Sequence, residues 1–300
     1  MVLKKPYVSP YKFFVMLERT INMKFTYLGT AAAEGWPALF CECDNCRRAA
    51  AAGGRNLRRR SHALIDNKLL IDFPADVYAS PRAIGMTLSK IHTLLITHSH
   101  SDHLYSDDFV MRYDVFAHFS DRTPLSVYGS REVIDLIHRV TGPLDREKDS
   151  QPYFLFNEVK AFDTFTADGY TITALPADHD QSSGPLIYSL TDGNSSMLYA
   201  HDTGYFFDSV WEYLERQKVC YDFVSLDCTN IKLPWRSHHM GIEACVDTAD
   251  RMRSIGAADE KTIFCVNHFS HNGGLIYDEL VPVMKEHGML VSYDTMSLEF

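Results

Sequence analysis

The chain contains 300 residues, 46% of them apolar, which is enough for a large core in one domain or two modest ones. Its net charge of −10 and its pI of about 5.7 speak against bulk binding to nucleic acid. No apolar run approaches the ~20 residues that cross a bilayer, and the short apolar piece 13–17 lacks the features of a secretory signal. Seven cysteines without such a signal favour reduced thiols or metal ligands, so we expect a cytoplasmic protein.

The first half of the chain is predicted to mix strands, helices and one long loop. Residues 1–22 form an N-terminal extension of unknown order, to which we assign no function. A loop rich in Cys and Arg is expected over 41–60. Apolar runs bounded by turn residues predict strands at 23–30, 61–66, 68–72, 91–96 and around 127–128. Helices are expected over 74–86, 105–120 and 131–140.

The second half continues in the same way, without repeats or low-complexity linkers. Strands are predicted at 153–158, 170–175, 185–191, 197–201, 222–226, 262–266, 290–293 and 297–300. Helices are predicted at 207–217 and 241–255. Strand-rich runs with interspersed helices in both halves predict two sheets covered by helices, in one α/β domain over 23–300.

The stretch THSHSDH, residues 97–103, concentrates metal-ligand side chains directly after the buried strand 91–96. The sheet fixes the backbone there, and the loop lets successive side chains converge on one point. His98 and His100 can face one ion, while Asp102 and His103 can reach a neighbouring one. Imidazole and carboxylate ligands suit Zn, Mn or Fe, so the loop alone does not select the metal.

Three further candidate ligands, His179, Asp202 and His268, each follow a predicted strand. We assign the seven ligands as follows: His98, His100 and His179 to one ion, Asp102, His103 and His268 to the other, and Asp202 as a bridge. Two ions ~3.5–4 Å apart can hold a bridging hydroxide as nucleophile. Five other histidines are interpreted as solvated or core residues: His62, His92, His118, His138 and His287.

This pattern resembles the metallo-β-lactamase fold, in which HSHSDH is followed by a His, an Asp and a His at successive strand ends. The resemblance covers about residues 23–300. It implies a four-layer αββα sandwich, with a dinuclear site at the edge between the two sheets.

A second cluster is CECDNC, in which Cys41, Cys43 and Cys46 form a CxCxxC knuckle for one tetrahedral zinc. The fourth ligand must come from elsewhere, and His271, three residues after His268, is the candidate. The alternative is a surface loop with reactive thiols. The other cysteines lie in apolar contexts and are interpreted as small core residues: Cys220, Cys228, Cys245 and Cys265.

The knuckle and several short sequence segments together resemble the phosphoribosyl 1,2-cyclic phosphate phosphodiesterases, accessory proteins of carbon–phosphorus lyase operons. The matching segments are YLGTAAAEGWPALFCECDNC, TALPADHD, PLIYSLTDG, YAHDTGYF and HHMG. In that family the knuckle and a His three residues past the last active-site His hold a zinc. The pyrroloquinoline quinone synthesis protein shares this knuckle, and the chain departs from the family in its GTAAAEG turn, so the substrate stays open.

The proton for the leaving oxygen is expected from His238 or His239, and the resemblance favours His239. The alternative is that this pair only caps a helix or faces solvent. Asp102 is expected to orient the nucleophilic water while it binds metal. The basic run 55–60 and the stretch 182–184 suggest contacts of Arg58, Arg60 and Ser183 with a phosphate, although such a run is more often a solvated loop.

These observations predict a dinuclear metal-dependent phosphodiesterase that attacks a small cyclic or diester phosphate with a metal-bridging hydroxide. The resemblance points to 5-phosphoribosyl 1,2-cyclic phosphate as the substrate. The expected cofactors are two divalent ions, Mn or Zn, and one structural Zn.

Four alternatives are an RNA 3′-end nuclease, a hydrolase of non-phosphate esters, a di-iron redox protein and a non-catalytic accessory protein. The acidic composition and the lack of an obvious inserted tRNA-binding arm disfavour the nuclease. The redox proteins carry a carboxylate where this chain has His100, and they lean on a flavin domain that this sequence lacks. We expect a small-molecule substrate and no membrane partner, and we leave open whether the chain forms a homodimer.

Overall fold

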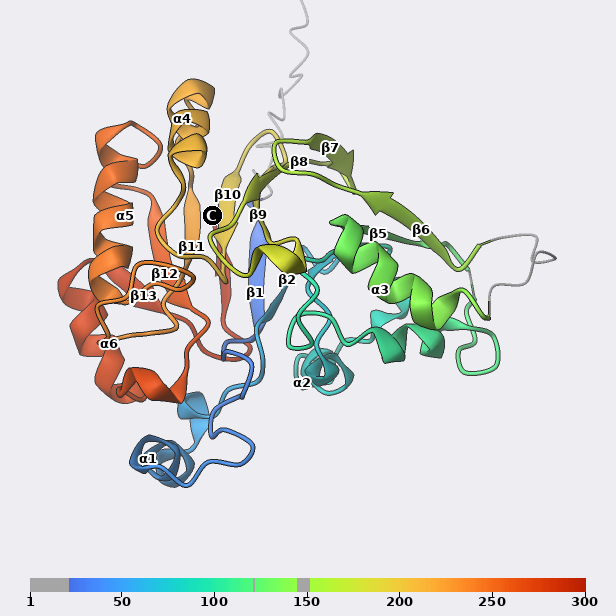
Figure 1. Ribbon diagram of the computed structural model, residues 1–300, viewed down its shortest axis with the longest axis horizontal. Coiled ribbons are helices and arrows are strands. Elements are labelled where there is room, and N and C mark those ends of the chain that lie inside the picture. The colour runs from blue at the N-terminus through green and yellow to red at the C-terminus, as the bar shows by residue number, and fades with distance from the viewer. Residues whose placement is uncertain (1–21, 121, 145–151) are drawn as a thin grey trace, which may run out of the picture.

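The computed structural model describes residues 22–120, 122–144 and 152–300, and within these ranges the strands form two seven-stranded sheets (Figure 1). The first sheet has the order β14-β1-β2-β3-β4-β5-β6, and the second has the order β13-β12-β11-β10-β9-β8-β7. The first sheet contains β1 Lys24–Gly29, β2 His62–Ile65, β3 Leu69–Ile71, β4 Thr93–Leu95, β5 Leu125–Gly129, β6 Phe154–Glu158 and β14 Ser297–Glu299. The second contains β7 Thr164–Ala167, β8 Tyr170–Pro176, β9 Leu186–Thr191, β10 Ser196–Ala200, β11 Phe223–Asp227, β12 Ile263–Asn267 and β13 Met289–Val291.

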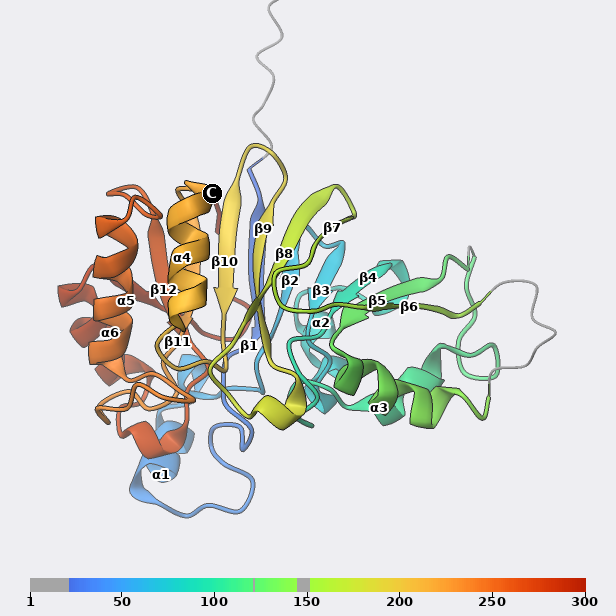
Figure 2. The ribbon, with the colours of Figure 1, turned by 45° about the horizontal axis from the view of Figure 1, so that its top comes forward.

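The two sheets pack face to face, and helices cover their outer faces. The outer face of the second sheet carries α4 Asp208–Gln217, α5 Ile242–Ser254 and α6 Tyr277–Glu286. The outer face of the first carries α3 Arg131–Thr141 and the 3₁₀ helix η4 Ser106–Arg112. Figures 1 and 2 show α4, α5 and α6 on one side of the molecule, and α3 and the short α2 Ser80–Ala83 on the other. The expected αββα sandwich is confirmed.

Alternating side chains explain why both faces of the first sheet are buried. In β4, Leu95 faces the core between the sheets, whereas Leu94 packs under η4 and α3. The same alternation places Ile71 of β3 inside and Leu70 outside. Strands buried on both faces appear as nearly continuous apolar runs, which is why they were visible in the sequence. Full burial of each such side chain stabilises the fold by roughly 1.5–3 kcal/mol.

Several predicted helices differ from the observed ones. The predicted helix 74–86 is instead a 3₁₀ turn, η2 Ala75–Tyr78, followed by the short α2 Ser80–Ala83. Pro81 fits only in the first turn of a helix, and Gly85 has a φ of 74°, so this segment cannot continue as one helix. The predicted helix 105–120 is helical only over η4, which is a 3₁₀ helix.

Two α-helices and one strand of the described residues were missed by the sequence analysis. The expected loop 41–60 contains α1 Asp44–Ala52, because the thiol of Cys43 accepts the backbone N–H of Cys46 and caps the helix. Helix α6 was missed because Pro282 inside it indicates a helix break. The short β7 pairs with β8 as a hairpin. The predicted N-terminal extension lies outside the described residues, apart from residue 22.

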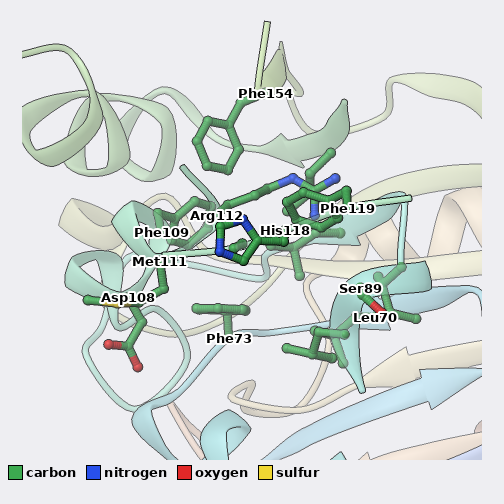
Figure 3. A pocket seen from close by; sticks show the side chains of 15 residues that line it. Leu70, Phe73, Ser89, Asp108, Phe109, Met111, Arg112, His118, Phe119 and Phe154 are labelled. Atoms are coloured by element: carbon green, nitrogen blue, oxygen red, sulfur yellow. The ribbon is translucent and has the colours of Figure 1, made fainter. Parts of the chain in front are cut away.

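The packing under η4 leaves a cavity of about 240 Å³, with Phe73, Phe109 and Phe154 among its walls (Figure 3). None of the seven predicted active-site ligands lines this cavity, so the cavity is separate from the predicted site. Within the described ranges, no helix is long and apolar enough to cross a membrane.

Candidate metal centre

The predicted ligands come together because the strands that precede them end at one edge of the sandwich. Strands β3, β4 and β5 run parallel in the first sheet, and β10, β11, β12 and β13 run parallel in the second. The segments after β4, β8, β10 and β12 carry the seven residues predicted as ligands: His98, His100, Asp102, His103, His179, Asp202 and His268. The fold therefore brings together side chains that are up to 170 positions apart (268 − 98 = 170).

The first predicted triplet is compact. His98 Nε2 lies 3.1 Å from His100 Nδ1, and His179 Nε2 lies 3.1 Å from the same nitrogen. The three ligand nitrogens all lie within 4.8 Å of one another. Burial and the neighbouring His103 hold the pKa of His98 well below its usual range. The neutral imidazole is the form that binds metal, so this environment suits a ligand.

The second predicted triplet, Asp102, His103 and His268, is also compact. His103 Nε2 lies 3.4 Å from Asp102 Oδ2 and 3.2 Å from His268 Nε2. All three residues are buried. Their oxygen and nitrogen donors suit Zn, Mn or Fe, as the sequence indicated.

Asp202 stands between the two triplets. Its Oδ2 is 2.6 Å from His103 Nε2 and 2.8 Å from His268 Nε2, and its Oδ1 is 3.7 Å from His179 Nε2. Although Oδ2 is this close to two ring nitrogens, it makes no hydrogen bond of good geometry with any described residue. A buried carboxylate oxygen that lies close to other metal-ligand atoms but lacks a hydrogen bond is expected where a cation sits between them. The donor set therefore fits two divalent metal ions.

Two positioning carboxylates were missed by the sequence analysis. Asp72 Oδ2 accepts from His103 Nδ1 at 2.7 Å, and its Oδ1 accepts from the backbone N–H and the hydroxyl of Thr97. Asp227 holds the far end of the site, because its Oδ2 accepts from the Thr229 hydroxyl, which in turn contacts His268 Nδ1 at 2.7 Å. Such partners fix the ring orientation of metal-binding histidines. Both carboxylates stand at the end of a strand, and the strand-end rule applied to the ligands would have found them.

The backbone at the site is unusual. Asp72, Asp202, His238 and His268 all have positive φ values, of 67°, 51°, 62° and 65°. Non-glycine residues rarely adopt this left-handed conformation, and such residues cluster at functional sites.

His239 borders the ligand cluster, whereas His238 is exposed. His239 Nδ1 lies 3.3 Å from Asp227 Oδ2 and 3.2 Å from Thr229 Oγ1, and the His239 ring lies nearly parallel to that of His268. Burial disfavours the charged ring, but the carboxylates of Asp227, Asp202 and Asp102 together outweigh it and raise the pKa of His239 to about 9. Metal ions bound nearby would lower that pKa again, because they add positive charge.

The cysteine knuckle forms a separate cluster. His271 Nδ1 lies 3.3 Å from Cys43 Sγ and 3.7 Å from Cys41 Sγ. These three atoms and Cys46 Sγ, four in all, lie within 4.8 Å of one another. The backbone N–H of Cys46 at the start of α1, together with further contacts, lowers the pKa of Cys43 to about 6. The lowered pKa favours a Cys43 thiolate at neutral pH, and three cysteine sulfurs with one imidazole are a suitable donor set for tetrahedral zinc.

A Cys43→Ser substitution should lower the zinc content by one ion per chain and reduce the melting temperature. The knuckle joins the loop before α1 to the segment that follows His268, so its loss should loosen both. Metal analysis by mass spectrometry and thermal unfolding would measure the two effects. Cys220, which we had interpreted as a core residue, is exposed and lies outside the cluster, so Cys220→Ser should leave both values unchanged. Equal zinc content in the two variants would contradict a structural zinc.

The three residues predicted to contact substrate, Arg58, Arg60 and Ser183, all have hydrogen-bond partners within the protein. The Arg58 guanidinium is buried, and its Nη1 donates to Thr30 Oγ1 at 2.9 Å and to the Ser292 carbonyl at 2.7 Å. Arg60 donates to the Ala33 carbonyl and to Asp76, and the Ser183 hydroxyl donates to the Asp180 carbonyl at 2.6 Å. These hydrogen bonds hold loops together in the described structure, and a role of the three residues in substrate binding stays a prediction.

The fold and the clustered histidines and aspartates define a member of the metallo-β-lactamase class. The chain belongs to the beta-lactamase superfamily domain family, whose model matches residues 67–264. No curated protein matches the chain significantly.

Solved structures with the same fold cover almost the whole chain. A diphosphatase from the PhnP family is 20% identical, with a TM-score of 0.72 over 93% of this chain and 97% of that one. Zinc-bound PqqB from Methylobacterium extorquens is 17% identical, with a TM-score of 0.71 over 92% and 100%. The short form of human tRNase Z is 14% identical, with a TM-score of 0.62 over 92% and 98%. At these identities the likeness establishes the fold alone.

Proposed function

We propose that the protein is a dinuclear metal-dependent phosphodiesterase that hydrolyses a small cyclic or diester phosphate. The observation that carries the proposal is Asp202, whose two oxygens face two compact sets of metal ligands while His239 stands at their side. We take 5-phosphoribosyl 1,2-cyclic phosphate as the first candidate substrate. The name of the PhnP-family diphosphatase supports phosphate chemistry on this fold.

The ligand residues would hold two divalent ions. Such ions, when bound, generate a nucleophile from water at neutral pH and offset the negative charge that develops on a phosphoryl group. His98, His100 and His179 would hold one, Asp102, His103 and His268 the other, and Asp202 both. Asp72 would keep the ring of His103 in place.

The protein would also move protons. His239 Nδ1 is held by Asp227 and Thr229, so the proton for the leaving oxygen would come from Nε2. Asp227 stabilises the imidazolium that carries this proton. Asp102 would orient the attacking water through its carboxylate.

Phosphorus NMR would test the substrate. The manganese-reconstituted protein would be incubated with 5-phosphoribosyl 1,2-cyclic phosphate, and with bis-p-nitrophenyl phosphate in parallel, and metal would be removed from the quenched mixtures before spectra are recorded. We expect the cyclic diester signal to be replaced by one new monoester signal, beside that of the 5-phosphate already present. Protein without metal should give no product. Cleavage of the artificial diester alone would rule out the ribosyl substrate, and silence on both would overturn the phosphodiesterase.

A further inference from the structure

A second hollow in the molecule is unusually basic. It is a pocket of about 680 Å³, whose walls include Trp36, Arg55, Arg58, Arg59, Tyr293 and Asp294. We call it the arginine pocket. None of the seven predicted active-site ligands is among its lining residues.

Positive charge exceeds negative charge in the arginine pocket, although the chain as a whole carries a net charge of −10. Its walls hold three guanidinium groups and one carboxylate, that of Asp294. Asp294 already accepts from the Thr30 hydroxyl at 2.7 Å and from the backbone N–H of Arg59 at 2.8 Å. Asp278 adds a second negative charge near Arg55. The three arginines therefore carry one more positive charge than Asp294 and Asp278 together can neutralise.

Arg58 is the cation that lacks a full set of partners. Its side chain lines the pocket, and the residue is only 5% exposed. Its guanidinium lies 4.2 Å from the centre of the Phe269 ring, and its Nε and Nη2 have no hydrogen-bond acceptor among the described residues. Because a buried charge is costly unless it is compensated, the pocket favours an anion in front of Arg58.

Arg55 and Arg59 are held at the pocket by neighbouring side chains. The Arg55 guanidinium lies 4.1 Å from the centre of the Tyr293 ring and donates to the Tyr277 hydroxyl at 3.3 Å. Arg59 lies 3.5 Å from Asp294 Oδ2. Guanidinium groups held in place lose little freedom on binding, and their planar N–H pairs match the oxygens of a phosphate.

We propose that the arginine pocket binds a small organic molecule that carries a phosphate monoester. Its volume exceeds what a phosphate alone needs and leaves room for an organic part of about nucleoside size. Arg55 and Arg59 bind the phosphate directly, and Arg58 attracts it from behind. This inference does not depend on the proposed phosphodiesterase activity.

Calorimetric titration of the metal-loaded protein with adenosine 5′-monophosphate would test the proposal, with adenosine and sulfate as companion probes. We expect two classes of sites, one at the metal centre and one in the arginine pocket. In the Arg55→Ala/Arg59→Ala double variant the affinity of the second class should fall at least tenfold. Arg216→Ala removes an exposed arginine at the end of α4 and should bind like the wild type.

A second titration separates the two sites. Asp202→Ala should lose the metal-centre class and keep the arginine-pocket class with one site per chain. The proposal fails if the double variant binds like the wild type, if adenosine binds as well as its monophosphate, or if Asp202→Ala binds no adenosine 5′-monophosphate. Equal binding of sulfate would show an unspecific anion site and would also overturn it. Absence of phosphodiesterase activity would leave these results unaffected, so the two hypotheses fail separately.

Discussion

An Asp202→Ala substitution should remove both active-site metal ions and lower kcat roughly 10³-fold or more, because the ions are expected to supply several kcal/mol of transition-state stabilisation. Asp202 is the residue whose carboxylate contacts both predicted triplets. Without it, the buried nitrogens of His103 and His268 would face each other at 3.2 Å with no negative charge between them. Neither ion would then keep its full set of ligands.

Metal analysis of the purified variant would measure this effect. The wild type should carry three ions per chain, two in the site and one in the knuckle, and Asp202→Ala should keep only the knuckle zinc. Asp250→Ala changes an exposed aspartate on α5 and should keep all three. Two tightly held ions in Asp202→Ala besides the knuckle zinc would rule out the bridging role.

A His239→Ala substitution should preserve the metal content but lower kcat about 10²–10⁴-fold, the usual contribution of a general acid. The loss should depend on the leaving group. An alkoxide from a sugar needs the proton from His239, whereas p-nitrophenolate leaves without help. The variant should therefore lose much more activity towards the cyclic ribosyl ester than towards bis-p-nitrophenyl phosphate.

The pH profile gives an independent measure of the same role. Since the acid must be protonated, kcat of the wild type should fall as the pH rises through the pKa of His239, which is about 9 without metal ions and lower with them. His239→Ala should lack this decline. His238→Ala, which changes the exposed neighbour, should behave like the wild type. Equal losses on both substrates, or metal loss in His239→Ala, would show that His239 is not the acid.

The sequence predicted the ligands better than their supports, and the reason is physical. The ligands in residues 98–103 could be predicted because four metal-ligand side chains lie in one short loop. His179, Asp202 and His268 could be predicted because each follows a strand, and the ends of parallel strands lie at one edge of a sheet. Asp72 and Asp227 also stand at strand ends, but they act through hydrogen bonds to other side chains, and that supporting role cannot be read from the sequence around them. The partners of Arg58 and Arg60 inside the protein could not be predicted, because they come from segments far away in the chain, and the contacts of both residues with a phosphate stay predictions.

Element boundaries show the same division between local and distant causes. The buried strands carry their own apolar signal, and nearly all of them were predicted. Helix α6 forms despite Pro282, because Leu280 and Met284 pack against the second sheet, and that gain exists only in the folded protein. Helix α1 depends on a cap from Cys43, a residue we had interpreted only as a metal ligand.

The left-handed backbone at Asp72, Asp202 and His268 sets function against stability. Each such residue costs about 1–2 kcal/mol, because its Cβ approaches the following carbonyl oxygen. Glycine would avoid this strain but would also remove the hydrogen bonds that Asp72 makes with Thr97 and His103, so the side chain is kept at the cost of backbone strain. Bound ions would offset this cost, since they stabilise only the folded chain that can hold them. The stability of this protein would then depend on the metal supply of its surroundings.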